Sequence, residues 1–112
     1  MVLAEGVRYI SQYAFSECRK LESITIPNSL EDIGIWAFAE CDNLKCVYVS
    51  SLEKWLSITF ANIGSNPLYC GADLYVGGVL LQDLVIPQSV NSINDYAFYN
   101  CNSIKSVTVH NG

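Results

Sequence analysis

Apolar residues recur with a period of 23 positions along most of the chain. Residues 7–21 and 30–44 match position by position, and the same frame returns over residues 90–104. Each copy carries the motif Ala-Phe-x-x-Cys and continues into a short stretch in which apolar and polar residues alternate. Such alternation predicts a strand with one buried face. Because a single unit could not bury its apolar side alone, the period predicts units that stack into a solenoid.

The predicted fold is a right-handed α/β solenoid. The alternating stretches are expected to pair in one parallel sheet, and they cover residues 24–27, 47–50, 84–87 and 107–110. Pro27 and Pro87 would each end a strand, because proline lacks a backbone donor. Residues 13–15 and their copies are too short for an independent helix, so we expect one helical or 3-10 turn on the side opposite the sheet.

The repeat frame divides the chain into four units of one predicted domain. Leu3 aligns with Ile26, so the chain begins inside an earlier copy. The units cover residues 1–23, 24–46, 47–83 and 84–112. The third unit is longer than the others, because residues 50–80 form an insertion that lacks the Ala-Phe-x-x-Cys motif.

The insertion has predicted elements of its own. Ser51 is placed to cap a short helix whose apolar face carries Trp55. Asn66-Pro67 marks a turn or the start of a short helix. Residues 74–81 predict a hairpin, with Gly77-Gly78 suited to the positive φ angles of a two-residue loop.

The full motif, I-x-I-P-x-x-V-x-x-I-x-x-x-A-F-x-x-C-x-x-L, resembles the BspA-like leucine-rich repeats. Residues 52–87 are similar to a variant coil that recurs in that family. The resemblance implies an α/β leucine-rich-repeat solenoid from a large exported protein of host-associated bacteria. It also implies a location at the cell surface and adhesion to host or neighbouring-cell proteins. The family motif contains no catalytic residue, so the resemblance assigns none to this chain.

The first residues, 1–5, lack the basic region and the long apolar region of a signal peptide. A surface location is therefore implied by the resemblance alone. With no signal, anchor or caps, the chain is expected to be a piece of a longer protein. Its uncapped terminal coils would expose apolar faces and strand edges, which predicts end-to-end self-association.

Charge narrows the class of partner. Eleven acidic residues against six basic ones give a net charge of −5, and the basic residues are scattered singly apart from Arg19-Lys20. Binding to nucleic acid or to an anionic membrane would need clusters of basic residues, so we expect neither. No apolar run approaches the ~18 residues that a membrane-spanning helix requires. The expected partner is a protein.

Cysteine and histidine offer little for catalysis or metal binding. Cys18, Cys41 and Cys101 occupy one repeat position, which predicts a column of buried thiols, with a Cys18–Cys41 disulfide as the alternative. An enzyme would need a thiol nucleophile such as Cys46 or Cys70, with a base. The single histidine, His110, lies at a strand exit near the end of the chain. We expect no enzymatic activity, no cofactor and no metal.

The candidate interaction surface is the outward face of the predicted sheet. Tyr48 is expected beside Val85, close to the insertion and its Trp55, as an aromatic binding patch. The predicted surface comprises Thr25, Tyr48, Val85, Thr108 and Trp55. In one alternative, the insertion packs its own tryptophan and tyrosines over the sheet. In another, the chain is a structural spacer with no ligand.

Overall fold

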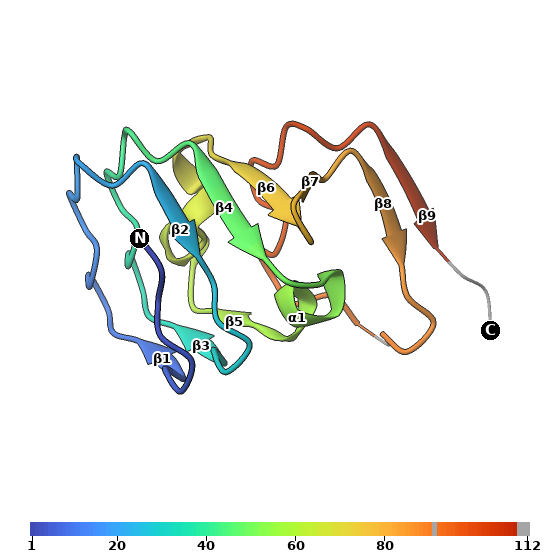
Figure 1. Cartoon of the computed structure of the whole chain (residues 1–112), viewed down its shortest axis with the longest axis horizontal. Coiled ribbons are helices and arrows are strands. Elements are labelled where there is room, and N and C mark those ends of the chain that lie inside the picture. The colour runs from blue at the N-terminus through green and yellow to red at the C-terminus, as the bar shows by residue number, and fades with distance from the viewer. Residues whose placement is uncertain (91, 110–112) are drawn as a thin grey trace.

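Short parallel strands lie side by side along the long axis of the molecule (Figure 1). The structure is a computed structural model, and it describes residues 1–90 and 92–109. Helices are few and short within these residues. The elements in chain order are β1 (Tyr9–Ile10), β2 (Ser23–Thr25), β3 (Asp32–Ile33), β4 (Cys46–Val49), α1 (Leu52–Ser57), β5 (Thr59–Phe60), η1 (Ile63–Ser65), η2 (Pro67–Cys70), β6 (Asp73–Val76), β7 (Val79–Leu80), β8 (Asp83–Ile86) and β9 (Ser106–Val109).

The principal sheet has the strand order β2-β4-β6-β7. Strands β2, β4 and β6 are parallel, so that Ile24, Val47 and Leu74 lie in one register and point into the core. The predicted alternation is thereby confirmed for β2 and β4. Before β2, Val2 forms a parallel bridge with Thr25, as the alignment of the first residues with the later copies predicted.

The expectation of one continuous sheet is wrong. Strand β6, inside the predicted insertion 50–80, takes the place next to β4 that the sequence pattern gave to β8. The chain then turns through Gly77-Gly78, and β7 pairs antiparallel with β6, so the edge of β6 is already occupied. Strand β8 therefore pairs with β9 in a separate two-stranded parallel sheet. The predicted hairpin and its two glycines at positive φ are confirmed.

A third sheet, which the sequence analysis did not predict, joins β1, β3 and β5 in parallel. Its inward residues are Ile10, Ile33 and Phe60, all buried. The pairing of Ile33 with Phe60 shows that the insertion supplies this strand as well. Residues 47–74 thus form a complete variant coil rather than a loop inserted into an ordinary one.

The Ala-Phe segments are tight turns instead of the expected helical or 3-10 turns. Tyr13 and Glu17 both have positive φ, as do the residues at the equivalent positions in the two other copies, Trp36, Glu40, Tyr96 and Asn100. The backbone N–H groups of Tyr13, Phe15 and Glu17 donate to carbonyls of the next coil rather than to their own. Hydrogen bonding between coils therefore replaces the i→i−4 pattern that a helix needs. The 3-10 helices lie in the variant coil instead.

Helix α1 begins as predicted, with the Ser51 hydroxyl accepting a hydrogen bond from the Lys54 backbone N–H at 3.1 Å. Its buried face carries Trp55 and Leu56. The interior is continuous along the stack, where Phe15 and Phe38 are stacked with ring centroids 5.3 Å apart. Phe38 in the second coil is fully buried, whereas Phe15 near one end is half-buried.

Candidate functional site

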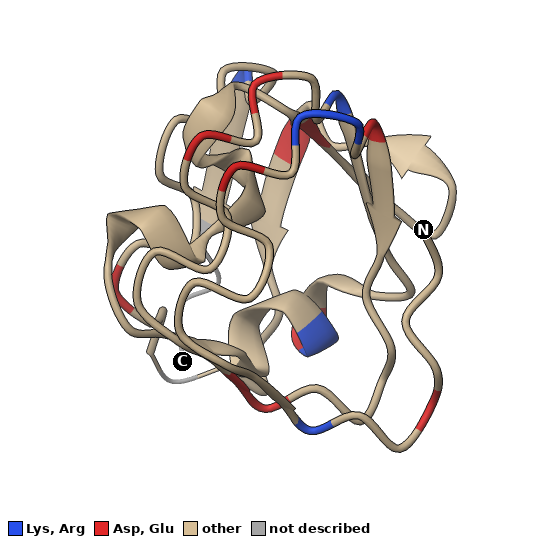
Figure 2. Cartoon of the chain, turned by 90° about the vertical axis from the view of Figure 1, so that its left-hand side faces the viewer, with Lys and Arg blue, Asp and Glu red and all other residues tan. Residues whose placement is uncertain are grey.

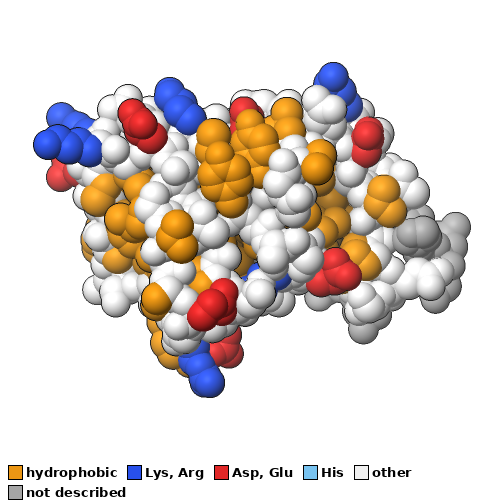
Figure 3. All heavy atoms as spheres, in the orientation of Figure 1, with side chains coloured by type: hydrophobic (Ala, Val, Ile, Leu, Met, Phe, Trp, Pro, Cys, Tyr) orange, Lys and Arg blue, Asp and Glu red, His pale blue; other side chains and the backbone are white. Residues whose placement is uncertain are grey.

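The outward face of the principal sheet carries a pair of tyrosines. Thr25, Tyr48 and Tyr75 occupy matching positions on β2, β4 and β6. The two tyrosine rings lie 5.2 Å apart at an angle of 35°. Tyr48 is 37% exposed and Tyr75 is half-buried. Leu80 on β7 lies opposite Tyr75, so the apolar surface continues across the hairpin. Figure 3 shows hydrophobic side chains gathered over β4 and β6.

We call Thr25, Tyr48, Tyr75 and Leu80 together the tyrosine patch. Its polar surroundings come from the adjacent row of side chains on the same face of the sheet. Ser23, Cys46 and Asp73 are in register there. A side-chain hydrogen bond to Cys46 raises the pKa of Tyr48 above its ordinary value, so the phenol stays neutral over the physiological range. A neutral, half-exposed aromatic pair beside small polar groups suits contact with another protein surface.

The structure brings together only part of the predicted interaction surface. Thr25 and Tyr48 are joined in the principal sheet, but Tyr48 lies beside Tyr75 rather than beside Val85. Val85 and Thr108 are partners in the separate sheet, where both are exposed. Their separation follows from the β6–β7 hairpin, which ends the principal sheet.

Trp55 does not belong to the exposed surface. Its side chain is 0% exposed and packs against Phe60, with ring centroids 5.2 Å apart. The indole N–H donates to the Ala97 carbonyl at 2.8 Å. Trp55 therefore fills the interior and ties the variant coil to the next one, instead of contributing to a binding patch.

Tyr75 is the residue that the sequence analysis missed. The signal was present, because Leu74-Tyr75-Val76 repeats the pattern of Val47-Tyr48-Val49. The assignment of residues 50–80 to an insertion concealed it, since the spacing between the two segments is not the usual period.

The five cysteines are free thiols. Of the three at the repeat position, Cys41 is buried in the core, and Cys18 and Cys101 are partly buried against it. The Cys41 thiol donates to the Phe15 carbonyl at 2.9 Å, and Cys70 makes the same kind of contact with Phe38 at 3.8 Å. Cys70 thus occupies the column position in the variant coil, which the sequence pattern did not show. Burial raises the pKa of Cys41 to about 11 and also raises the pKa values of Cys70 and Cys101. A raised pKa disfavours the thiolate and with it nucleophilic chemistry.

No cluster of side chains in the described ranges, 1–90 and 92–109, offers three or more His, Cys, Asp or Glu groups to a metal ion. His110 lies outside the described residues. The same ranges contain no helix long and apolar enough to cross a membrane.

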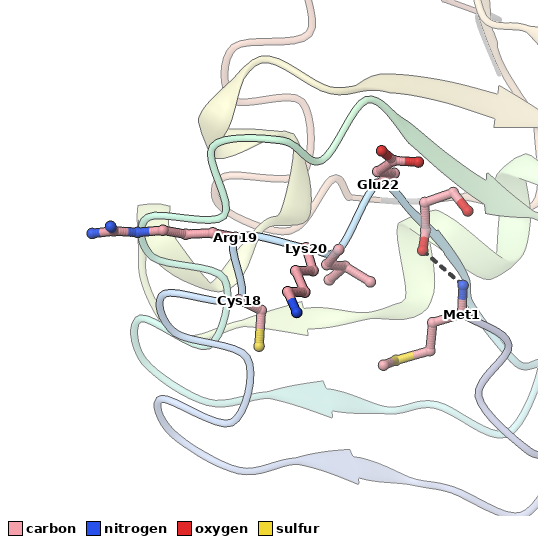
Figure 4. Close-up of a pocket in the computed structure, with 7 residues that line it drawn as sticks. Met1, Cys18, Arg19, Lys20 and Glu22 are labelled. Atoms are coloured by element: carbon pink, nitrogen blue, oxygen red, sulfur yellow. Dashed lines mark hydrogen bonds between the residues drawn. The ribbon is translucent and has the colours of Figure 1, made fainter.

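An open cavity of about 600 Å³ lies at the N-terminal end of the stack (Figure 4). Met1, Cys18 and Leu21 contribute its apolar lining, and Arg19 points away from it. The Met1 ammonium donates to the Ser23 carbonyl at 3.0 Å, which fixes the first residues along β2. The cavity is the end face of the coil stack, where apolar side chains lack a covering layer among the described residues.

Stacked coils with parallel strands, tight turns and a recurring Ala-Phe-x-x-Cys motif define a solenoid-like leucine-rich-repeat protein. The chain belongs to the family described as "BspA type Leucine rich repeat region", which matches residues 1–110 in six copies. Repeats of this family generally serve protein interaction rather than catalysis.

Among solved structures, the chain is similar to the crystal structure of a T. pallidum leucine rich repeat protein, TpLRR. The two are 22% identical with a TM-score of 0.47, and the alignment covers 96% of this chain. The chain spans 56% of the length of that structure. No curated protein matches the sequence significantly.

Proposed function

We propose that this chain is a protein-interaction segment of a bacterial cell-surface leucine-rich-repeat protein. Its role would be adhesion to host or neighbouring-cell proteins, without catalysis. The tyrosine patch is the contact surface in this proposal. The observation that carries it is the Tyr48–Tyr75 pair, whose rings are in tilted contact on the outward face of the sheet, with Tyr48 exposed and Tyr75 half-buried.

Physical properties of the patch support this choice. Tyrosine offers a large apolar surface with a polar end, and few rotatable bonds are frozen when it is bound. Because β4 and β6 are held in register by backbone hydrogen bonds, the two rings need little rearrangement to meet a partner. Each coil of a longer array would add a modest contact, and several together would give strong binding.

The test is binding of the folded chain to a panel of extracellular-matrix and plasma proteins. We expect saturable binding that Tyr48→Ala/Tyr75→Ala weakens about 10-fold or more, since buried interface tyrosines are frequent hot spots. The matched control, Tyr9→Ala/Tyr96→Ala, removes two exposed tyrosines away from the patch and should bind like the unchanged chain.

Equal loss in both variants would overturn the assignment to the tyrosine patch. Absence of any binding by the folded chain would favour the structural spacer, which holds other domains apart and needs no ligand. Circular dichroism of each variant separates lost binding from lost folding.

We also propose that coil stacks associate end to end. Val107 on β9 occupies the inward-facing position at which Ile24 and Val47 are fully buried, yet it is 60% exposed. The cavity beside Met1 leaves the other end of the stack similarly uncovered.

A further inference from the structure

A second surface lies on the stacked turns, apart from the tyrosine patch. A groove of about 380 Å³ is lined there by Tyr13, Glu17, Trp36, Glu40 and Tyr69, with two small residues between them. Three successive coils each supply one aromatic residue to the groove, namely Tyr13, Trp36 and Tyr69. Viewed along the stack, acidic residues recur on neighbouring turns on one side of the molecule (Figure 2). The groove therefore combines aromatic faces with negative charge.

The aromatic part of the groove is held rigidly. The Trp36 ring lies so close to Gly64 that a methyl group added at Gly64 would sit 2.1 Å from ring atom Cε3. The Trp36 backbone N–H donates to the Asn62 side chain at 3.1 Å. Tyr69 meets the Trp36 ring edge-on, at 5.9 Å and 78°, and stacks on Tyr99 at 6.0 Å. Two aromatic faces at nearly a right angle form two walls of a preformed pocket.

The carboxylates of the groove are uncompensated. Glu17 and Glu40 hold equivalent positions in successive coils. The Glu17 backbone N–H donates to the backbone carbonyl of Ala39, so the two turns are stacked directly. Both side chains are exposed, and neither forms an ion pair within the part of the chain that the structure describes. Like charges on neighbouring coils, about 4.8 Å apart, repel each other. None of the residues lining the groove is basic, so a cation from outside is the group that would relieve this repulsion.

We propose that the groove binds an arginine side chain of a protein partner. A guanidinium group is planar and can stack through a cation–π contact on the side of Trp36 or Tyr69 that lines the groove, opposite Gly64 and Tyr99. Its N–H groups are arranged to donate to the carboxylates of Glu17 and Glu40 at the rim. The acidic balance of the whole chain favours the approach of such a basic segment. This proposal does not depend on the function assigned to the tyrosine patch.

The probe for the experiment is the peptide acetyl-Gly-Arg-Gly-amide, titrated into the ¹⁵N-labelled chain. The two indole N–H signals report on it separately. We expect the Trp36 signal to shift saturably, with a Kd on the order of 1 mM, as suits one exposed cation site. The Trp55 indole is buried and hydrogen-bonded to Ala97, so its signal should stay in place and act as an internal reference. The same peptide with citrulline for arginine lacks the charge and should shift neither signal.

Two variants of equal charge change separate this site from general electrostatic attraction. Glu17→Gln/Glu40→Gln should weaken peptide binding about fivefold. Glu22→Gln/Glu53→Gln removes two exposed acids outside the groove and should bind like the unchanged chain. An unmoved Trp36 signal, equal shifts with the citrulline peptide, or equal weakening in both variants would each overturn the proposal. Since Tyr48→Ala/Tyr75→Ala leaves the groove intact, it should retain arginine binding, so the two proposals fail independently.

Discussion

At the scale of single residues, the buried thiol of Cys41 makes the free energy of unfolding depend on pH in the alkaline range. Its pKa is about 11 in the folded chain against an ordinary value of 9.0, chiefly because burial disfavours the thiolate. The folded state therefore holds the proton more tightly than the unfolded state. This contribution to the free energy of unfolding is fully present below pH 9 and is lost as the pH rises from 9 to 11.

We expect Cys41→Ala to lose part of this pH dependence. In reducing buffer, urea unfolding of the unchanged chain should show a free energy of unfolding that falls between pH 9 and 11. About 2 kcal/mol or less of that fall belongs to Cys41. The variant should be less stable at pH 8, because it leaves a small cavity, but its stability should fall less steeply. Cys46→Ala, at the half-exposed thiol on the sheet face, serves as the control. Identical slopes in Cys41→Ala and the unchanged chain would contradict this account.

Single positions also show how far the sequence could predict the candidate site. The period assigned Thr25 and Tyr48 to the outward face, because alternation along a strand determines which side chains point inward. It could not predict the neighbour of Tyr48, since that depends on which later segment pairs with β4. Trp55 was misassigned for a similar reason. Its helical face was identified, but the Ala97 carbonyl that its indole contacts lies 42 residues further along the chain.

At the scale of elements, the variant coil is attached to the following coil by Asn66. This side chain is fully buried. Its amide donates to the carbonyls of Tyr96, at 2.6 Å, and Ala97, at 3.1 Å, and its oxygen accepts from the Leu68 backbone N–H at 2.8 Å. One amide thus caps a 3-10 helix and satisfies buried backbone groups of the next turn.

Replacement of Asn66 by alanine should lower the free energy of unfolding by about 2–4 kcal/mol, because three hydrogen bonds of a fully buried side chain are lost together. Asn43→Ala is the matched comparison. The Asn43 amide also donates to a backbone carbonyl of another coil, that of Arg19, but at an exposed position. Its loss should cost less than about 1 kcal/mol. Equal destabilisation of the two variants in urea unfolding would show that Asn66 does not couple the coils.

Some of these elements could be predicted from the sequence, and others could not. Strands β2, β4, β8 and β9 followed from alternation, and the β6–β7 hairpin followed from Gly77-Gly78, which are local signals. The tight Ala-Phe turns did not, because every second N–H group, those of Tyr13, Phe15 and Glu17, is satisfied by the adjacent coil rather than within the segment. A helical turn and a stacked turn of this length have the same local apolar pattern. Only the pairing between coils distinguishes them, and it depends on residues about one repeat away.

At the scale of the whole molecule, the two ends of the stack differ from its middle. Buried side chains such as Phe38 and Val47 are covered by coils on both sides, whereas Val107 and the cavity beside Met1 are open. Among residues 1–90 and 92–109, β9 pairs only with β8, so the other edge of this parallel pair has no strand against it. Contact between unlike ends repeats without closing, so association would produce short chains of molecules rather than a defined dimer.

Val107→Lys should therefore reduce self-association, since it places a charge on the open apolar face next to a free strand edge. We expect sedimentation velocity at rising concentration to show growing species for the unchanged chain and mainly monomer for the variant. Thr108→Lys adds the same charge one residue further on, at an exposed outward position, and should still associate. A chain that stays monomeric at high concentration would contradict end-to-end stacking. Equal loss in both variants would mean that net charge, rather than the end face, controls assembly.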